Sequence, residues 1–302
     1  MQTFLPYPNF RASAQVLDPA RLGKQRVETL QILRAIELPD YGWRNHPAVA
    51  MWRGRTPALV RYGLDCVQAW TALGHADSTA AQIGEFAPEV AERTQADLAR
   101  AGQLPTWLGD ERLHNSHRAR LVAKDPAYYG PRFPGTAPDD EYWWPEPDDV
   151  IPDPPNRPVP AGHLWVLRPE TEAALGRCVA QGLVGFGPAT GLLADVAGHD
   201  LAMLRERLEP ATRRPPRALR ALAELISDVR TGDDIAVAVS GGRALLVGAV
   251  AGDYRFVRTD PAQLHHRRPV EWTEVVARST VQPPAALQDV RPLFSVPWEP
   301  PR

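Results

Sequence analysis

The sequence predicts two domains, an all-α domain followed by an α+β domain. Its 302 residues suffice for two globular cores of about 150 residues each. Between them, residues 145–162 (PEPDDVIPDPPNRPVPAG) hold seven prolines, which indicate a semi-rigid linker because proline neither continues a helix nor donates to a sheet. No strand-like alternation precedes residue 160, whereas β-rich runs follow it. We therefore expect domains at 1–144 and 163–302.

Composition is that of an ordinary soluble protein. Lys and Arg number 34 against 36 acidic residues, and 44% of residues are hydrophobic. No apolar run approaches a membrane span, and the first residues lack a signal-peptide pattern, so we expect a cytoplasmic protein with no membrane association. Cys66 and Cys178 lie far apart in unlike contexts, which excludes a disulfide scaffold and a cysteine metal site. No cofactor is expected.

Helical periodicity dominates the first domain. Leu22, Leu30 and Leu33 recur at helical spacing in residues 19–36, with Asp18 as the expected N-cap and Pro19 at the first helical position. Further helices are expected at 56–74 and 88–102, and another is expected to begin at Pro47.

The second domain alternates strands and helices. Strands are expected at 163–169 and 267–275, and a helix at 217–230. Residues 170–187 predict a helix that leads into a short strand. Residues 233–257 contain two β-rich runs joined by Ser-Gly-Gly, which indicates a hairpin. We expect a small barrel or curled sheet with helices packed on it.

The basic residues are 32 arginines and only two lysines, Lys24 and Lys124. An arginine side chain keeps its proton, whereas a lysine can act as an amine nucleophile, so both lysines are candidates for chemistry. Lys24 shares one face of the first long helix with Arg21, Glu28 and Gln31. The alternative is a solvated face with a Lys24–Glu28 ion pair.

Basic and aromatic residues are interleaved at 42–55 and 105–130, a pattern that suits a nucleic-acid backbone and an unstacked base. The alternative is a helical hairpin with an aromatic core. His114 and His117 lack a third ligand at metal-binding spacing, so no metal is expected. The DNA contacts expected here and on the first helix are Gln25, Arg44, His46, His114, His117, Arg118, Lys124 and Tyr128.

The ordered motifs LGKQRVE, GWRNHPAVAMWRGRTPALVRYG, ALGHAD and HNSHRARLVAKDPAYY resemble the bacterial branch of the pyrimidine-dimer DNA glycosylase family, over residues 1–145. The resemblance implies a compact all-α fold that flips nucleotides and cleaves the glycosidic bond. It also implies that an N-terminal α-amine acts with a glutamate on the first helix, while arginines hold phosphates.

Transferring these roles leaves alternatives open. Arg26 matches the family's helix arginine, but a gapless alignment places the glutamate on Val27, one residue before Glu28. Gln2 is large, so the initiator methionine would stay and the amine would be that of Met1. Alternatively, the side-chain amine of Lys24 replaces the α-amine as nucleophile, or a water molecule attacks the sugar. The candidate catalytic residues are Met1, Gln2, Lys24, Arg26 and Glu28.

The second half resembles the PUA-like or EVE-like reader domains of modification-dependent restriction enzymes. The resemblance rests on HLWVLRP, on the G-D-D-I and G-x-V-x-G-D-Y-x-F stretches, and on HHRRPVEW. It implies an aromatic cage for a flipped modified base, formed by Trp165, Phe186, Tyr254, Phe256 and Trp272, although these rings could equally fill the core. Basic residues that could hold phosphates are Arg213, Arg214, Arg217 and the run at 265–268.

Together these features predict a DNA glycosylase, with or without AP-lyase activity, that excises a modified or damaged pyrimidine from double-stranded DNA. Anti-phage defence is favoured over housekeeping pyrimidine-dimer repair, and no obligate protein partner is expected. The alternative is a non-catalytic reader of modified DNA or RNA, which Val27 and a retained Met1 would favour.

Overall fold

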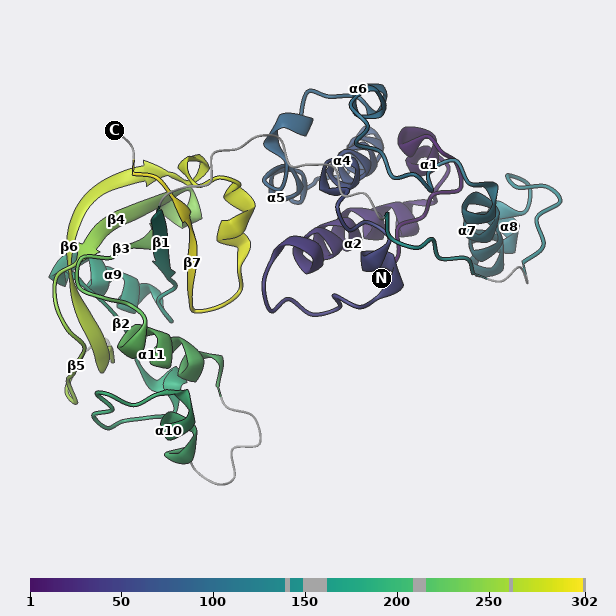
Figure 1. Cartoon of the computed structure of the whole chain (residues 1–302). Helices are drawn as coiled ribbons and strands as arrows, with labels where there is room; N and C mark the ends of the chain where they lie inside the picture. Colours follow the sequence, from purple (N-terminus) through teal and green to yellow (C-terminus); the bar gives the residue numbers. More distant parts are fainter. Residues whose placement is uncertain (139–141, 149–161, 209–215, 261–262, 301–302) are drawn as a thin grey trace. The chain divides into compact units, whose positions relative to one another are not determined.

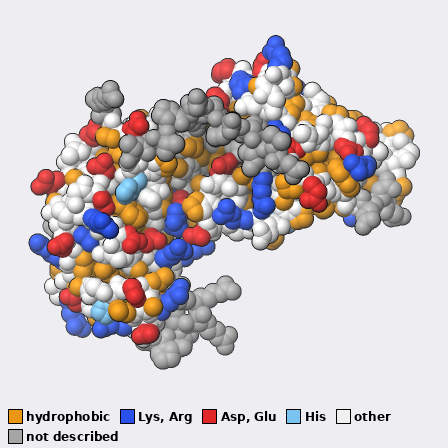
Figure 2. All heavy atoms as spheres, viewed as in Figure 1, with side chains coloured by type: hydrophobic (Ala, Val, Ile, Leu, Met, Phe, Trp, Pro, Cys, Tyr) orange, Lys and Arg blue, Asp and Glu red, His pale blue; other side chains and the backbone are white. Residues whose placement is uncertain are grey.

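The computed structural model describes residues 1–138, 142–148, 162–208, 216–260 and 263–300. The chain divides into two compact units, Met1–Arg157 and Pro158–Arg302 (Figure 1). On the face shown in Figure 2, basic and acidic side chains are interspersed over each unit. Within the described parts, no helix is long and apolar enough to cross a bilayer.

The first unit is helical throughout its described residues (Figure 1). The predicted start of the long helix is confirmed, because the Asp18 carboxylate accepts hydrogen bonds from the backbone N–H groups of Ala20 and Arg21. The helices are α1 (Phe10–Gln15), α2 (Pro19–Glu37), α3 (Pro47–Ala50), α4 (Thr56–Ala72), α5 (Ala80–Gly84), the 3₁₀ helix η1 (Pro88–Val90), α6 (Gln95–Arg100), α7 (Glu111–Lys124) and α8 (Pro126–Tyr129).

One expected helix is broken. Residues 88–102 form η1 and α6 instead of one helix, because Thr94 caps α6 in a reciprocal capping box with Asp97. Helices α2 and α4 pack closely at Gly63, where a Cβ atom would lie 2.7 Å from Cγ2 of Thr29. A side chain at position 63 would therefore push these two helices apart.

After α8, the chain returns across the first unit as residues 142–148, which we call the strap. Nε of Arg55 lies 2.5 Å from a carboxylate oxygen of Asp148, and both side chains are buried. The Thr106 hydroxyl also donates to Asp148. The predicted linker begins at residue 145, but residues 145–148 are thus part of the first unit, and its last residue, Gly162, begins a strand of the second unit.

The second unit contains a mixed seven-stranded sheet with the order β2-β6-β4-β3-β1-β7, to which β5 adds on β6. Strands β1 and β3 are parallel, and the other pairs are antiparallel. The strands are β1 (Gly162–Leu167), β2 (Leu183–Phe186), β3 (Asp234–Val239), β4 (Ala244–Val250), β5 (Arg255–Phe256), β6 (His266–Ala277) and β7 (Leu293–Trp298). The hairpin expected at 233–257 is formed by β3 and β4.

Of the two expected forms, a small barrel and a curled sheet, the barrel is not closed, because β2 and β7 are edge strands that do not pair with each other among the described residues. The sheet curls instead, as Figure 1 shows. Alternate residues face two cores: Trp165 and Leu167 of β1 pack with α11 (Arg217–Ser227), whereas Leu164 and Val166 pack with Trp298 and its neighbours. Helices α9 (Glu172–Gln181) and α10 (Leu201–Glu206) and the 3₁₀ helices η2 (Pro188–Thr190), η3 (Ser240–Gly242), η4 (Arg278–Thr280) and η5 (Pro284–Gln288) complete the unit.

Candidate active site in the helical unit

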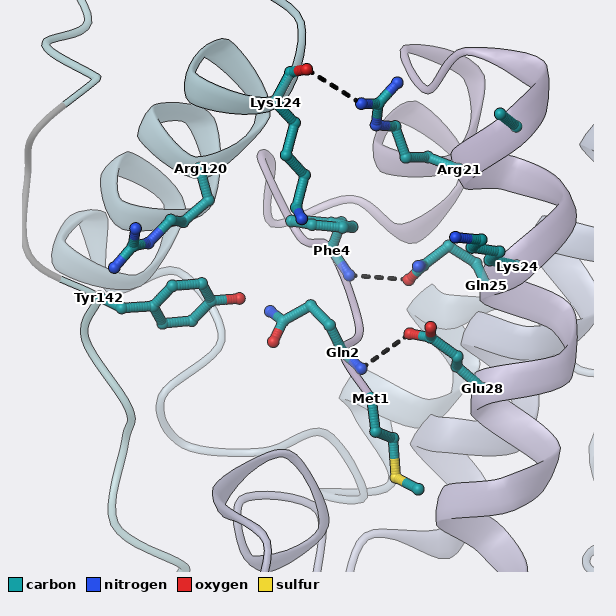
Figure 3. Close-up of a pocket in the computed structure, with 11 residues that line it drawn as sticks. Met1, Gln2, Phe4, Arg21, Lys24, Gln25, Glu28, Arg120, Lys124 and Tyr142 are labelled. Atoms are coloured by element: carbon teal, nitrogen blue, oxygen red, sulfur yellow. Dashed lines mark hydrogen bonds between the residues drawn. The ribbon is translucent and has the colours of Figure 1, made fainter.

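A pocket of about 550 Å³ opens on the first unit, between α2, α7, the N-terminal segment and the strap (Figure 3). This volume is within the range of small-molecule sites and is sufficient for an extruded nucleotide. Its walls are Met1, Gln2, Phe4, Ala20, Arg21, Lys24, Gln25, Glu28, Arg120, Lys124 and Tyr142.

The N-terminal segment is fixed in place by side chains from three helices. The Phe4 N–H donates to Oε1 of Gln25 over 2.8 Å, and the Tyr62 hydroxyl lies 2.9 Å from the Phe4 carbonyl. The Leu5 N–H donates to Nδ1 of His117, also over 2.8 Å. Because the backbone of an otherwise irregular segment is satisfied in this way, the chain end is positioned at the pocket.

His114 and His117 were predicted to contact DNA, but both are completely buried. His114 Nδ1 lies 2.7 Å from the Leu5 carbonyl, so both histidines bind the N-terminal segment. Burial lowers the pKa of His117 to about 3, which keeps its ring neutral. Arg118 donates to the Pro6 carbonyl over 2.9 Å and serves the same segment.

Glu28 occupies the pocket wall beside the chain end. Its carboxylate accepts a hydrogen bond of 2.8 Å from the backbone N–H of Gln2 (Figure 3). Val27, the gapless alternative, has 43% of its side chain exposed and does not line the pocket. Of the two positions, only Glu28 brings its side chain to the wall of this pocket.

Both lysines of the chain line this one pocket, Lys24 from α2 and Lys124 from the end of α7 (Figure 3). Among the described residues, neither ammonium group forms an ion pair, so the alternative Lys24–Glu28 pair is not present. Arg21 pairs with Asp18 over 2.9 Å and donates to the Lys124 carbonyl. The pocket thus combines one carboxylate with a cationic rim.

Arg26, predicted as catalytic, is held away from the pocket. Its guanidinium pairs with Asp77 and lies 4.4 Å over the Trp70 ring. Since residues two apart on a helix face different directions, Arg26 and Glu28 cannot share a site through their positions on α2. Arg26 therefore stabilises the packing of α2 on α4 and the Asp77 loop.

The remaining predicted DNA contacts occupy varied positions. Gln25 lines the pocket but is only 1% exposed, and its Oε1 already accepts from Phe4 and Tyr62. His46 caps α3 by accepting from the Ala48 N–H, and burial and the nearby positive N-terminus both lower its pKa. Arg44 and Lys124 are exposed, whereas Tyr128 is half-buried beneath the Arg132 guanidinium.

The sequence-based site lacks five of the residues that line the pocket, Phe4, Ala20, Arg21, Arg120 and Tyr142. Arg120 lies within the basic and aromatic cluster at 105–130 but was not assigned a role, and Tyr142 stands in an acidic, proline-rich stretch next to the predicted linker. The available signal was spacing, because Arg120 and Lys124 are four residues apart on one helix and share a face.

In the second unit, the predicted aromatic cage is not assembled. Phe186 is fully buried in the core of the second unit. Trp165, Tyr254 and Trp272 pack against that same core, and Phe256 contacts His265 and His266. Among the described residues, no two of the five predicted rings pair with each other. Arg213 and Arg214 lie outside the described residues.

Residues 1–82 match the family model of pyrimidine dimer DNA glycosylases. The matched segment contains Met1, Gln2, Lys24 and Glu28, and it supports a DNA glycosylase-type function for the first unit. Arg120, Lys124 and Tyr142 lie beyond it. Residues 176–286 match a domain family of unknown function, which gives no support to the PUA-like resemblance. A search of curated proteins found no match.

The described residues contain no group of three or more His, Cys, Asp or Glu side chains placed to hold a metal ion.

Proposed function

We propose that the first unit is a DNA glycosylase that binds an extruded pyrimidine nucleotide in the pocket and breaks its glycosidic bond, with Glu28 as the catalytic carboxylate. The observation that carries this proposal is the 2.8 Å hydrogen bond between the Gln2 N–H and Glu28. Both residues line the pocket, and both lie within the segment that matches the glycosylase family model. A pyrimidine stacked in a duplex cannot reach such a pocket, so the nucleotide must leave the helix.

In the water-dependent route, the C1′–N1 bond breaks and its electron pair stays on the base. Glu28 stabilises the positive charge that develops on the sugar, and it accepts a proton from the water that attacks C1′. The departing base then takes up a proton. The products are a free base and an abasic site.

In the amine-dependent route, an amine nitrogen attacks C1′ and displaces the base, which keeps the electron pair of the C1′–N1 bond and takes up one proton from the amine. The C1′–O4′ bond then breaks, O4′ takes up the second amine proton, and the resulting imine with the opened sugar permits strand cleavage by β-elimination. Three amines suit this role. An α-amine on residue 2 would occupy the position of the Gln2 nitrogen, beside Glu28, and that of Met1 lies one residue away. Lys24 lies one turn from Glu28 on the same helix.

The rim of the pocket supports a DNA substrate. Arg21, Lys24 and Lys124 lie on it, and phosphates are the groups that such cations bind. The base is proposed to be a damaged or modified pyrimidine, and the setting anti-phage defence, with the second unit recognising the modified base. The linker would then raise the local concentration of the first unit near that base. Housekeeping repair of pyrimidine dimers is the competing setting.

The test is base release and strand cleavage on a panel of duplexes that differ at one position. The panel contains unmodified DNA, a cyclobutane thymine dimer, 5-methylcytosine, 5-hydroxymethylcytosine, its glucosylated form and 5-hydroxymethyluracil. We expect release from at least one modified duplex, and a loss of at least about 100-fold in Glu28→Gln with DNA binding retained. Glu92→Gln, at an exposed glutamate outside the pocket, is the matched control.

Absence of release from every duplex, together with tight binding of one of them, would overturn the glycosylase proposal and support the non-catalytic reader. Stronger competition by RNA than by modified DNA would indicate an RNA ligand for that reader.

A further inference from the structure

The wall opposite Glu28 carries two hydrogen-bond donors that the described residues leave unused. The Tyr142 hydroxyl and Nε of Arg120 are both buried, and neither has a hydrogen-bond partner among the described residues. Both side chains line the pocket, Tyr142 from the strap and Arg120 from α7, and Figure 3 shows the hydroxyl directed into it. A buried donor without a partner destabilises a fold, and an acceptor on a ligand bound in the pocket would compensate for that loss.

The Tyr142 ring is firmly placed. It stacks on Trp144 with a centroid distance of 4.6 Å and contacts His117 at 5.4 Å, while the Arg120 guanidinium carbon lies 5.2 Å from its centre. The strap is anchored at its far end by the Arg55–Asp148 pair. Burial raises the pKa of Tyr142, so the phenol keeps its proton and can donate it to a hydrogen bond.

We propose that Tyr142 and Arg120 bind the leaving base, by donating hydrogen bonds to a carbonyl oxygen of the extruded pyrimidine. The proposal rests on the glycosylase function above and assigns the two walls of its pocket: the sugar faces Glu28 and Gln2, and the base faces the strap and α7. Trp144, behind Tyr142, holds the phenol at this wall.

The chemistry favours donors at this place. When the C1′–N1 bond breaks, its electron pair delocalises onto the carbonyl oxygens of the pyrimidine. A hydrogen bond to these oxygens therefore strengthens as the bond breaks, and it lowers the barrier more than it tightens substrate binding. Arg120 adds a positive charge beside the developing negative charge, and among the described residues no carboxylate pairs with its guanidinium.

Tyr142→Phe tests the proposal, because it removes only the hydroxyl and keeps the stacked ring. We expect the single-turnover rate of base release to fall by about 10- to 100-fold, the loss typical of a hydrogen bond to a charged group. Tyr7→Phe is the matched control, since the Tyr7 ring packs on Phe133 outside the pocket. The control should release base at the wild-type rate.

A binding measurement separates this proposal from the glycosylase function. In a Glu28→Gln background, fluorescence anisotropy compares the panel duplex bound most tightly with the same duplex carrying a tetrahydrofuran abasic analogue. We expect Tyr142→Phe and Arg120→Gln to weaken binding of the base-bearing duplex by about three- to tenfold. Binding of the duplex that lacks the base should change by less than about twofold, because the phosphate contacts are kept.

Equal effects on the two duplexes, or no effect on either, would overturn the assignment of the base wall even if wild-type protein releases bases. A selective loss for the base-bearing duplex would support it even if the wild-type protein released none, and in that case only the glycosylase function would fail.

Discussion

The backbone nitrogen of Gln2 lies 2.8 Å from the carboxylate of Glu28, so the chain end is in direct contact with an acidic side chain of the pocket wall. The contact depends on residues far apart in sequence, because Gln25 and His117 hold the next residues of the N-terminal segment in place. The Gln2 nitrogen is a peptide amide while Met1 is present, and removal of Met1 would turn it into an α-amine beside a carboxylate, the arrangement that imine chemistry at a sugar carbon needs.

The first prediction concerns the identity of that amine. We expect borohydride to trap a covalent DNA adduct on the N-terminal peptide, because an α-amine loses its proton more readily than a lysine side chain does. Lys24→Arg keeps the positive charge but removes the alternative nucleophile, so it should retain the adduct. Mass spectrometry of the digested adduct locates the modified residue.

Lys124→Arg is the matched control, since it makes the same change on the other wall of the same pocket. If Lys24→Arg loses the adduct and Lys124→Arg keeps it, the nucleophile is Lys24. Base release without any adduct would favour the route through water.

The second prediction concerns the cationic rim. Lys124 is exposed at the pocket and forms no ion pair with a described residue, so Lys124→Gln should remove one phosphate contact. We expect the slope of log Kd against log salt concentration to fall by about 0.9, the value for one displaced counterion. Titrations at four salt concentrations measure it. Arg100→Gln, at an exposed arginine paired with Asp97, should leave the slope unchanged, and an unchanged slope in Lys124→Gln would remove Lys124 from the interface.

The third prediction is a pH dependence of stability from His117. Its folded-state pKa is lowered to about 3 by burial, whereas the unfolded chain binds the proton near pH 6.5. The contribution of His117 is therefore fully present above pH 6.5 and is lost as the pH falls toward 3, at up to about 1.4 kcal/mol per pH unit. Urea unfolding at a series of pH values measures this loss.

His117→Asn keeps a hydrogen-bond acceptor for the Leu5 N–H but cannot titrate. The difference in free energy of unfolding between wild type and His117→Asn should accordingly shrink as the pH falls from 6.5. For His163→Asn, at an exposed histidine of the second unit, the difference in free energy of unfolding from wild type should stay constant over the same pH range. A constant difference between wild type and His117→Asn across this range would show that the ring is not held neutral.

Local signals in the sequence determined much of the secondary structure. Asp18 and Pro19 marked the start of α2 because an N-cap side chain and a proline act on the adjacent backbone. The Ser-Gly-Gly turn between β3 and β4 was equally local. The expected barrel failed because closure requires pairing between strands that are distant in the chain, and β2 and β7 remain edges of the described sheet.

The sequence by itself singled out Glu28 and two rare lysines, but only the tertiary structure placed Lys24 and Lys124, one hundred residues apart, in one pocket. Only the tertiary structure shows that Tyr142 lines the same pocket, and that His117, predicted from the sequence to contact DNA, is buried. The physical reason is that spacing along a helix tells which residues share a face, whereas the element that covers this face is decided by long-range packing.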